Sequence, residues 1–200
     1  AITGVNQVVL NSATAAVSGT GTKTNLTVGA SGVVTVTGSQ SITSQLDVVS
    51  GGTLNANGNI TLVSNALGTA RVDEMDAGAI VGDVNVERYI PVGNRAFRFI
   101  GSTVSGPTVF NSWQEAGNNA AAGVGVQVTG TAGTVGVVNA TSGHDETVSG
   151  AVSMYKWDVA GQAWATVANT KNEVLNAGSY YRLYVRGDRT TDLSDNAAVH

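Results

Sequence analysis

The stretch that decides the fold is residues 25–62, NLTVGASGVVTVTGSQSITSQLDVVSGGTLNANGNITL, in which short apolar runs are separated by glycines. Its first half is echoed twenty positions later in its second half. The echo matches Leu26, Val28, Gly32, Val34, Gly38 and Ile42 with Leu46, Val48, Gly52, Leu54, Gly58 and Leu62. A period of this length is typical of a β-solenoid, in which each coil stacks on the next. We therefore expect stacked β-coils here.

Within this stretch, apolar residues alternate with Thr, Asn and Ser, which is the pattern of a strand with one buried face. Only two coils align well, whereas about three are needed for a stable stack. The segment from Ile2 to Val17 is therefore expected to supply an N-terminal cap or an earlier, degenerate coil. The alternative is an ordinary β-sandwich whose hairpins happen to be evenly spaced.

The composition excludes several classes of protein. The chain has 200 residues, a net charge of −4, 12% charged residues and no cysteine. It offers no Lys/Arg stripe for phosphate contacts, which argues against a nucleic-acid partner. It has no apolar run near the ~20 residues of a membrane helix, so we expect no membrane insertion. Abundant Thr, Asn and Gly in place of charge favour an extracellular protein of a bacterial cell surface.

Charge divides the chain into two regions. Lys23 and Asp47 are the only ionisable side chains before Arg71. We therefore predict a solenoid-like segment over residues 1–75 and a second domain over 76–200. In the second region, alternating runs at 83–90, 96–100, 151–157 and 180–185 predict strands of an antiparallel β-sandwich or jelly roll. The predicted fold class is all-β throughout.

Four segments of the second region, taken in order, carry a resemblance. They are GDVNVERYIP (82–91), RAFRF (95–99), NSWQE (111–115) and YRLYVRGDR (181–189). This order resembles a module of very large secreted surface proteins of flavobacteria and their relatives. In that family a glycine-punctuated β repeat often precedes the block, as it does here.

The resemblance implies export by the type IX secretion system and a structural or adhesive role at the cell surface, in some members in gliding motility. Its implied partners are neighbouring modules of the same protein, identical copies and the secretion machinery. The family's C-terminal sorting domain has no counterpart before His200. We therefore expect a fragment of a longer protein, incomplete at its C-terminus.

Catalysis is not expected. Sugar-cleaving solenoid enzymes need two carboxylates that flank the scissile bond, and Asp47 is the only carboxylate before residue 71. A serine triad would need His144 as its base, and no Gly-x-Ser-x-Gly motif frames a nucleophile. We predict an adhesive module without a cofactor, the alternative being a carbohydrate-binding module of a secreted protein.

Aromatic residues are the main candidates for ligand binding, because a flat ring can stack on a sugar ring. Trp113 and Trp164 are the candidates for contact with surface glycans. Phe97, Phe99 and Trp157 are instead expected in the sandwich core, which has few other large side chains. The period-two spacing places Tyr155 with Trp157, and Tyr180 with Tyr184, on common faces.

Acidic loops offer weaker candidates. Calcium takes oxygen ligands from loops, so Asp192, Asp195 and Asn196, or the earlier group Asp73, Glu74 and Asp76, are candidate ligands. The alternative is a pair of solvated turns. The run from His144 to Glu146 is expected to be a polar loop rather than a metal site, because consecutive side chains of an extended chain point to opposite sides.

The tripeptide Arg186-Gly187-Asp188 invites comparison with integrin-binding motifs. It follows a strongly alternating run, so we interpret it as a strand end followed by a tight turn. Asp188 is expected to cap that turn and to pair with Arg186 or Arg189.

Overall fold

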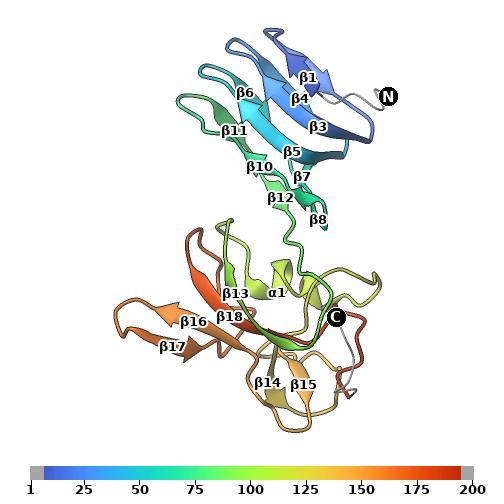
Figure 1. Ribbon diagram of the computed structural model, residues 1–200, viewed down its shortest axis with the longest axis vertical. Helices are drawn as coiled ribbons and strands as arrows, with labels where there is room; N and C mark the ends of the chain where they lie inside the picture. The colour runs from blue at the N-terminus through green and yellow to red at the C-terminus, as the bar shows by residue number, and fades with distance from the viewer. Residues whose placement is uncertain (1–6, 195–200) are drawn as a thin grey trace. The chain divides into compact units, whose positions relative to one another are not determined.

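The computed structural model describes residues 7–194, and nearly all of its regular structure is β. The chain forms two compact units, Ala1–Ile90 and Pro91–His200 (Figure 1). Among the helices of the described residues, none is long and apolar enough to cross a membrane. The predicted all-β class, with a solenoid-like segment and an antiparallel sheet, is confirmed.

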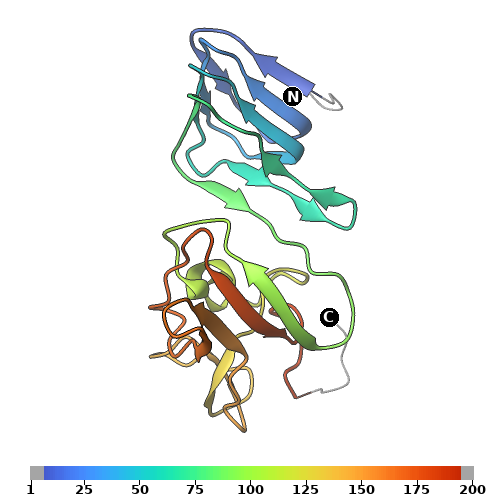
Figure 2. The same ribbon diagram turned by 60° about the vertical axis from the view of Figure 1, so that its left-hand side comes forward.

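The first unit consists of two parallel sheets between which the chain passes back and forth (Figure 2). The first sheet has the order β1-β3-β5-β7-β12, with β10 paired to β5, and the second has the order β11-β6-β4-β2. The strands are β1 (Gln7–Leu10), β2 (Ala15–Val17), β3 (Gly21–Val28), β4 (Val33–Val36), β5 (Gln40–Val48), β6 (Thr53–Asn55), β7 (Ile60–Leu62), β10 (Arg71–Val72), β11 (Ala79–Val81) and β12 (Val84–Val86). A short hairpin of β8 (Ser64–Asn65) and β9 (Gly68–Thr69) interrupts the last coil.

The register of the strands reproduces the repeat of the sequence. Leu26 pairs with Leu46 between β3 and β5, and Val34 pairs with Leu54 between β4 and β6. The strands β1 and β2 pair with β3 and β4 in the same parallel manner. Residues 7–17 therefore form an earlier coil, which settles one of the two expectations for this segment, whereas Ile2 lies outside the described residues.

The interior of the first unit is aliphatic, because every second side chain of both sheets points between them. The buried cluster consists of Leu26, Val28, Val34, Val36, Ile42, Leu46, Val48, Leu54, Ala56, Ile60, Leu62 and Ala70. One lysine joins this interior: Lys23 is buried and donates to Gln40 Oε1, while Gln40 Nε2 donates to the carbonyls of Gly19 and Gly38. Burial lowers the pKa of Lys23 from its ordinary value.

Close approach of adjacent coils explains the glycines at the corners. A Cβ added to Gly38 would lie 2.1 Å from the carbonyl oxygen of Gly19, and one added to Gly78 would lie 2.0 Å from that of Val48. No side chain fits at such distances unless the backbone moves. The glycines of this unit therefore allow coils to stack as well as turns to form.

The domain boundary predicted near residue 75 is wrong. The first unit continues to Ile90, because β11 pairs with β6 and β12 pairs with β7. The charged residues that begin at Arg71 occupy β10 and the loop before β11 rather than a linker between domains. The content of charged residues rises at the exposed loop before β11, but the pairing of strands continues beyond this loop to β11 and β12.

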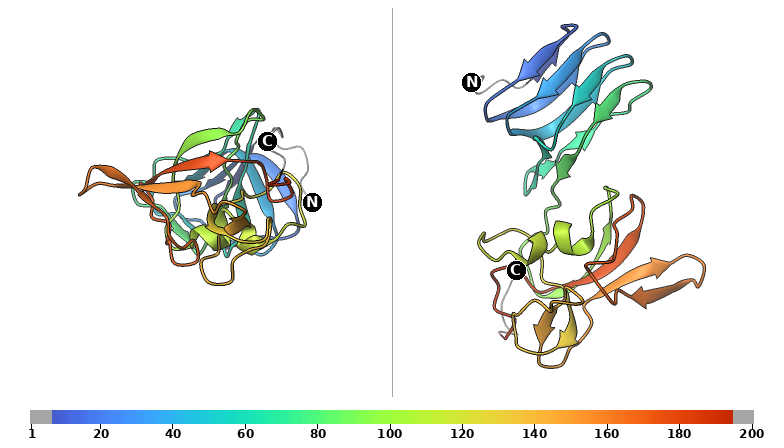
Figure 3. Two further views of the ribbon diagram at one scale, coloured as in Figure 1. Left: turned by 90° about the horizontal axis from the view of Figure 1, so that it is seen from below. Right: turned by 180° about the vertical axis from the view of Figure 1, so that it is seen from behind.

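The second unit contains a four-stranded antiparallel sheet in the order β13-β18-β16-β17. Its strands are β13 (Ala96–Gly101), β18 (Tyr180–Val185), β16 (Met154–Asp158) and β17 (Ala163–Thr166). The other elements are α1 (Val109–Ser112), the 3-10 turn Glu115–Gly117 and a parallel pair of β14 (Thr129–Ala132) and β15 (Asp145–Thr147). The hairpin of β16 and β17 projects from the rest of the unit (Figure 3).

One face of this sheet is covered by short elements and loops. Tyr181 is fully buried, packs edge-on against Trp113 beside α1 at a ring distance of 5.2 Å, and donates to Glu173. Burial, with Glu173 close by, raises the pKa of the Tyr181 hydroxyl. The antiparallel sheet is as predicted, but among residues 91–194 no second sheet of comparable size faces it to complete a sandwich.

Candidate ligand-binding face

The four-stranded sheet has one buried face and one open face. Side chains alternate along each strand, so Ile100, Tyr181 and Leu183 point to the buried side and their neighbours in sequence point the other way. The chain has three Trp, five Tyr and three Phe residues. Seven of these eleven lie on the open side of the sheet, namely Phe97, Phe99, Tyr155, Trp157, Trp164, Tyr180 and Tyr184. We call this set the aromatic face.

Solvent reaches much of the aromatic face. Phe99 is 73% exposed, Tyr180 is 63% exposed and Phe97 is 43% exposed. The other four rings are half-buried, largely against one another. Exposed apolar patches of this kind mark places where a protein contacts something other than water.

Contacts between the rings hold the face in one arrangement. Trp157 and Trp164 are directly opposed on β16 and β17, with ring centres 5.3 Å apart and planes at 63°. Phe99 reaches Trp164 from β13 at 5.7 Å, and Phe97 meets Tyr184 of β18 edge-on at 5.1 Å. Each such pair contributes about 0.5–1.5 kcal/mol beyond its area burial, so the surface is partly organised before any ligand arrives.

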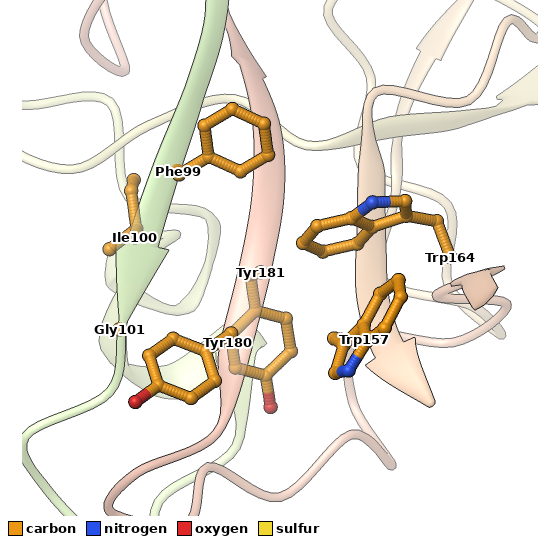
Figure 4. Close-up of a pocket in the computed structure, with 7 residues that line it drawn as sticks. All are labelled: Phe99, Ile100, Gly101, Trp157, Trp164, Tyr180 and Tyr181. Atoms are coloured by element: carbon orange, nitrogen blue, oxygen red, sulfur yellow. The ribbon is translucent and has the colours of Figure 1, made fainter. Parts of the chain in front are cut away.

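A shallow groove of about 510 Å³ runs across one part of the aromatic face. Its lining consists of Phe99, Ile100, Gly101, Trp157, Trp164, Tyr180 and Tyr181. Figure 4 shows the rings of Phe99 and Tyr180 on one side and those of Trp164 and Trp157 on the other. Gly101 of β13 adds no side chain beside the ring of Tyr180.

One cation lies within the aromatic face. The guanidinium carbon of Arg182 is 4.6 Å from the ring centres of both Phe97 and Tyr155 and 5.7 Å from that of Trp164. Cation–π contacts of this kind are favourable and fix the orientation of the guanidinium. The salt bridges of residues 7–194 are Lys156–Glu173 and Arg189–Asp145, so Arg182 has no carboxylate partner in that part of the chain.

A second arginine extends this arrangement along β18. The guanidinium of Arg186 lies 5.0 Å from the ring centre of Tyr184. Burial lowers the pKa of Arg186, Tyr184 acts in the opposite direction and nearby Arg95 adds to the lowering. No outward position of the four strands carries Asp or Glu, so the open side combines aromatic rings with positive charge.

The two tryptophans predicted to contact ligands have different positions. Trp164 lines the groove, as a binding residue would. Trp113 does not, because it lies at the end of α1 and packs against Tyr181 on the covered side of the sheet. The structure therefore brings Trp164 together with Trp157 and Phe99 and separates it from Trp113.

The expectation that Phe97, Phe99 and Trp157 form the core is wrong. Both phenylalanines are exposed, and Trp157 lines the groove. Phe97 and Phe99 alternate along β13 and therefore lie on one face of the sheet. The alternation does not show which face of the sheet is covered. The sequence signal for this surface is that Tyr180 and Tyr184 share a face, although the sequence does not tell whether that face is open or covered.

The segment from His144 to Glu146 is not the expected polar loop, because His144 and Asp145 are almost fully buried beside and within β15. Asp145 Oδ2 accepts from Arg189 Nη1 at 2.6 Å, from Gln114 Nε2 at 3.0 Å and from the amide of Val128 at 2.9 Å. The three consecutive side chains have separate partners, so they do not converge on one point.

The imidazole of His144 is fully engaged in this interior. Its Nε2 lies 3.1 Å from the carbonyl oxygen of Val167, which can only accept, so Nε2 carries the proton. Its Nδ1 lies 3.1 Å from the Thr131 hydroxyl. Burial lowers the pKa of His144, while the bond to Val167 and the charge of Asp145 oppose this lowering.

The turn after β18 is as predicted in one respect and different in another. The carboxylate of Asp188 accepts from the amide and hydroxyl of Thr190 at 2.8 Å each and from the amide of Gly123, so it caps the turn. These hydrogen bonds hold the pKa of Asp188 below its usual value in spite of its partial burial. The expected pairing with Arg189 is wrong, because Arg189 turns inward to Asp145.

The candidate calcium ligands are only partly described. The carboxylate of Asp192 accepts from the amide and hydroxyl of Ser194 at 2.8 and 2.7 Å, and these bonds lower its pKa. Asp195 and Asn196 lie outside the described residues. Within residues 7–194, no group of three His, Cys, Asp or Glu side chains is arranged to hold a metal ion, the group around Asp73 included.

A comparison of the chain with protein-family models, curated proteins and solved structures found no match.

Proposed function

We propose that this chain is a non-catalytic, adhesive module of a large bacterial cell-surface protein exported by the type IX secretion system. In this proposal the first unit is a structural segment and the aromatic face of the second unit is the contact surface. The observation that carries the proposal is the set of seven aromatic side chains on the open side of one sheet.

The stacked coils support a structural role for the first unit. Both of its parallel sheets end in strands with an unpaired edge among the described residues, β1 and β2 at one end and β11 and β12 at the other. Unpaired edges form hydrogen bonds with further strands. Neighbouring modules of the same protein, or identical copies, are therefore the proposed partners of this unit.

The absence of catalysis is also part of the proposal. His144 is the histidine that a serine triad would need, and it is only 2% exposed, with both ring nitrogens in hydrogen bonds. The groove is lined by apolar and aromatic side chains and carries no carboxylate. These groups suit binding rather than bond cleavage.

Adhesion is tested by coating beads with the chain and counting those that stay attached to bacterial cells and to polysaccharide-coated glass under flow. We expect the double substitution Phe99→Ala and Tyr180→Ala to remove most of the attachment. The control is Val148→Ala, which shortens an 83% exposed side chain away from the aromatic face. Undiminished attachment of the folded double variant would exclude the aromatic face as the contact surface.

A carbohydrate-binding module of a secreted protein is the second candidate, and the shallow groove lined by Trp157, Trp164 and Tyr180 favours it. A groove lined by aromatic rings fits single sugar chains, whereas an adhesive surface needs only broad contact. Binding of short soluble oligosaccharides that is lost in Trp164→Ala, without loss of stability, would favour this candidate.

A further inference from the structure

We propose that the ligand of the aromatic face is an acidic polysaccharide, whose sugar rings stack in the groove and whose carboxylates pair with Arg182. This inference rests on the proposed function and names the class of ligand for the same surface. It follows from the position of the Arg182 guanidinium among aromatic rings, without a carboxylate partner in residues 7–194. A site for neutral sugars would not require such a cation.

Arg182 is placed to meet a ligand that occupies the groove. Its guanidinium contacts the ring of Trp164. In the register of the sheet, Arg182 on β18 is paired directly with Phe99 on β13. Trp164 and Phe99 both line the groove. A sugar ring stacked on Trp164 therefore lies close to the guanidinium, which borders the groove without lining it.

No carboxylate of residues 7–194 neutralises the charge of Arg182. Among residues 7–194 it has no salt bridge, its side chain makes no hydrogen bond, and its Nε is buried without a partner. The opposite case is Arg189, which is buried and pairs with Asp145 through Nη1. A guanidinium held by three rings and lacking a carboxylate presents its planar fork to an incoming carboxylate, which it can bind with two hydrogen bonds.

The rest of the open side favours the same kind of ligand. Arg186 adds a second positive charge on β18, and no outward position of the four strands carries Asp or Glu. The complementary ligand is thus apolar on its ring faces and negative at its edges. A polymer of uronic acids has both properties, whereas a neutral glycan lacks the charge and an acidic peptide lacks the sugar ring.

The test is to measure binding of the full chain to three soluble polymers by calorimetry. They are polygalacturonate, the same polymer with its carboxyl groups methyl-esterified, and poly-L-glutamate. We expect polygalacturonate to bind most tightly and the other two to bind roughly ten-fold more weakly or not at all, because each lacks one of the two features. Binding to polygalacturonate should weaken as salt rises, since partly exposed charges are screened.

Two arginine variants provide matched controls. Arg182→Gln should lower the affinity for polygalacturonate by roughly ten-fold and leave that for the methyl ester unchanged. Arg98→Gln removes the same charge from the other side of β13, opposite Leu183, and should change neither affinity. Unfolding by denaturant shows that each variant is folded.

Each outcome decides between the two proposals. Equal binding of the acid and its methyl ester, with loss in Trp164→Ala, would overturn the acidic ligand and keep the adhesive face. Equal binding of poly-L-glutamate would show a general anion site and also overturn the inference. If no polymer binds but beads still attach through the aromatic face, only the acidic polysaccharide is excluded; if attachment is absent as well, both proposals fail.

Discussion

The two units of this chain differ in where they place their aromatic and polar side chains. The first unit buries Leu, Val and Ile between two parallel sheets and presents Thr, Asn and Ser to solvent. The second unit leaves aromatic rings in solvent and buries Arg189, Asp145, Gln114 and His144. Within the first unit Tyr89 is the only aromatic residue.

This difference reflects how each unit builds its interior. Stacked coils need only a repeated aliphatic side chain at each level, although Lys23 and Gln40 are buried there as well. The second unit uses long-range polar contacts to organise its loops, and its four-stranded sheet carries seven aromatic side chains on its open side. Substitutions in each unit test this difference between the two interiors. All three tryptophans lie in the second unit, so tryptophan fluorescence reports on that unit alone.

The largest loss of stability is expected for Asp145→Ala. It leaves the guanidinium of Arg189 buried without its counter-charge and removes the acceptor of Gln114 and Val128. We expect a cost of about 3–5 kcal/mol in fluorescence-detected unfolding by guanidinium chloride. Asp158→Ala, at an exposed position of the β16–β17 hairpin, should cost less than about 1 kcal/mol. A similar small cost for Asp145→Ala would mean that the buried pair does not organise the unit.

Leu54→Ala should destabilise the first unit alone. Leu54 is fully buried between the sheets, so truncation leaves a cavity and costs about 2–5 kcal/mol. We expect the circular dichroism transition of the first unit to shift while the tryptophan transition stays in place. Val33→Ala, at a 39% exposed site in the neighbouring strand, is the control. A shift of the tryptophan transition would show that the two units do not unfold independently.

Gly38→Ala should destabilise the first unit by about 1–3 kcal/mol, because the new methyl group would overlap the backbone of Gly19 and push two coils apart. Gly21→Ala is the matched control, since its Cβ would make only ordinary contacts with the side chains of Gln40 and Lys23. Thermal unfolding followed at the β-sheet band measures both. Equal stability of the two variants would contradict the close stacking of the coils.

Phe99→Ala should cost about 1 kcal/mol or less, although it removes a large side chain, because the ring is 73% exposed and its main contact is with Trp164. The same substitution at a core position would cost about 3–5 kcal/mol. Fluorescence-detected unfolding of the variant makes the distinction. A cost near the core value would show that the aromatic face supports the fold rather than a ligand.

The smallest effect is expected from His144. Its burial lowers its pKa below the ordinary 6.5, so the unfolded chain binds a proton more readily than the folded one as the pH falls. The contribution of the neutral His144 to the stability of the folded state is complete above pH 6.5. It is lost as the pH falls through the lower pKa that His144 has in the folded state. Stability of the second unit should therefore fall more steeply on acidification in the wild type than in His144→Gln. Parallel pH profiles would contradict a buried, neutral imidazole.

Much of the first unit was predictable because its contacts repeat along the sequence. The pairing of Leu26 with Leu46 and of Ile42 with Leu62 follows from a period that can be read directly. The end of the unit was not predictable from charge, because the charged loop before β11 interrupts the composition but not the pairing. The hairpin of β8 and β9 lengthens that coil and hides the repeat.

The candidate site was only partly predictable. Trp164 was predicted to contact a ligand and it lines the groove, and alternation predicted the common faces of the rings on β16 and on β18. Trp113 was assigned the same role, but its contact with Tyr181 joins segments far apart in the sequence. Arg182 gave no signal, because an arginine within a strand has no local feature that reveals a missing partner.

By itself the sequence determined the stacked coils and the two-sided character of each strand, because both depend on the spacing of apolar residues along a local stretch. The tertiary structure alone decided which side of the second unit's sheet is covered. It also decided that Arg189 turns inward to Asp145, forty-four positions away, while Arg182 lies among the rings with no carboxylate partner in residues 7–194. These choices depend on contacts between distant segments, and a one-dimensional pattern contains no information about which of two faces those segments will cover.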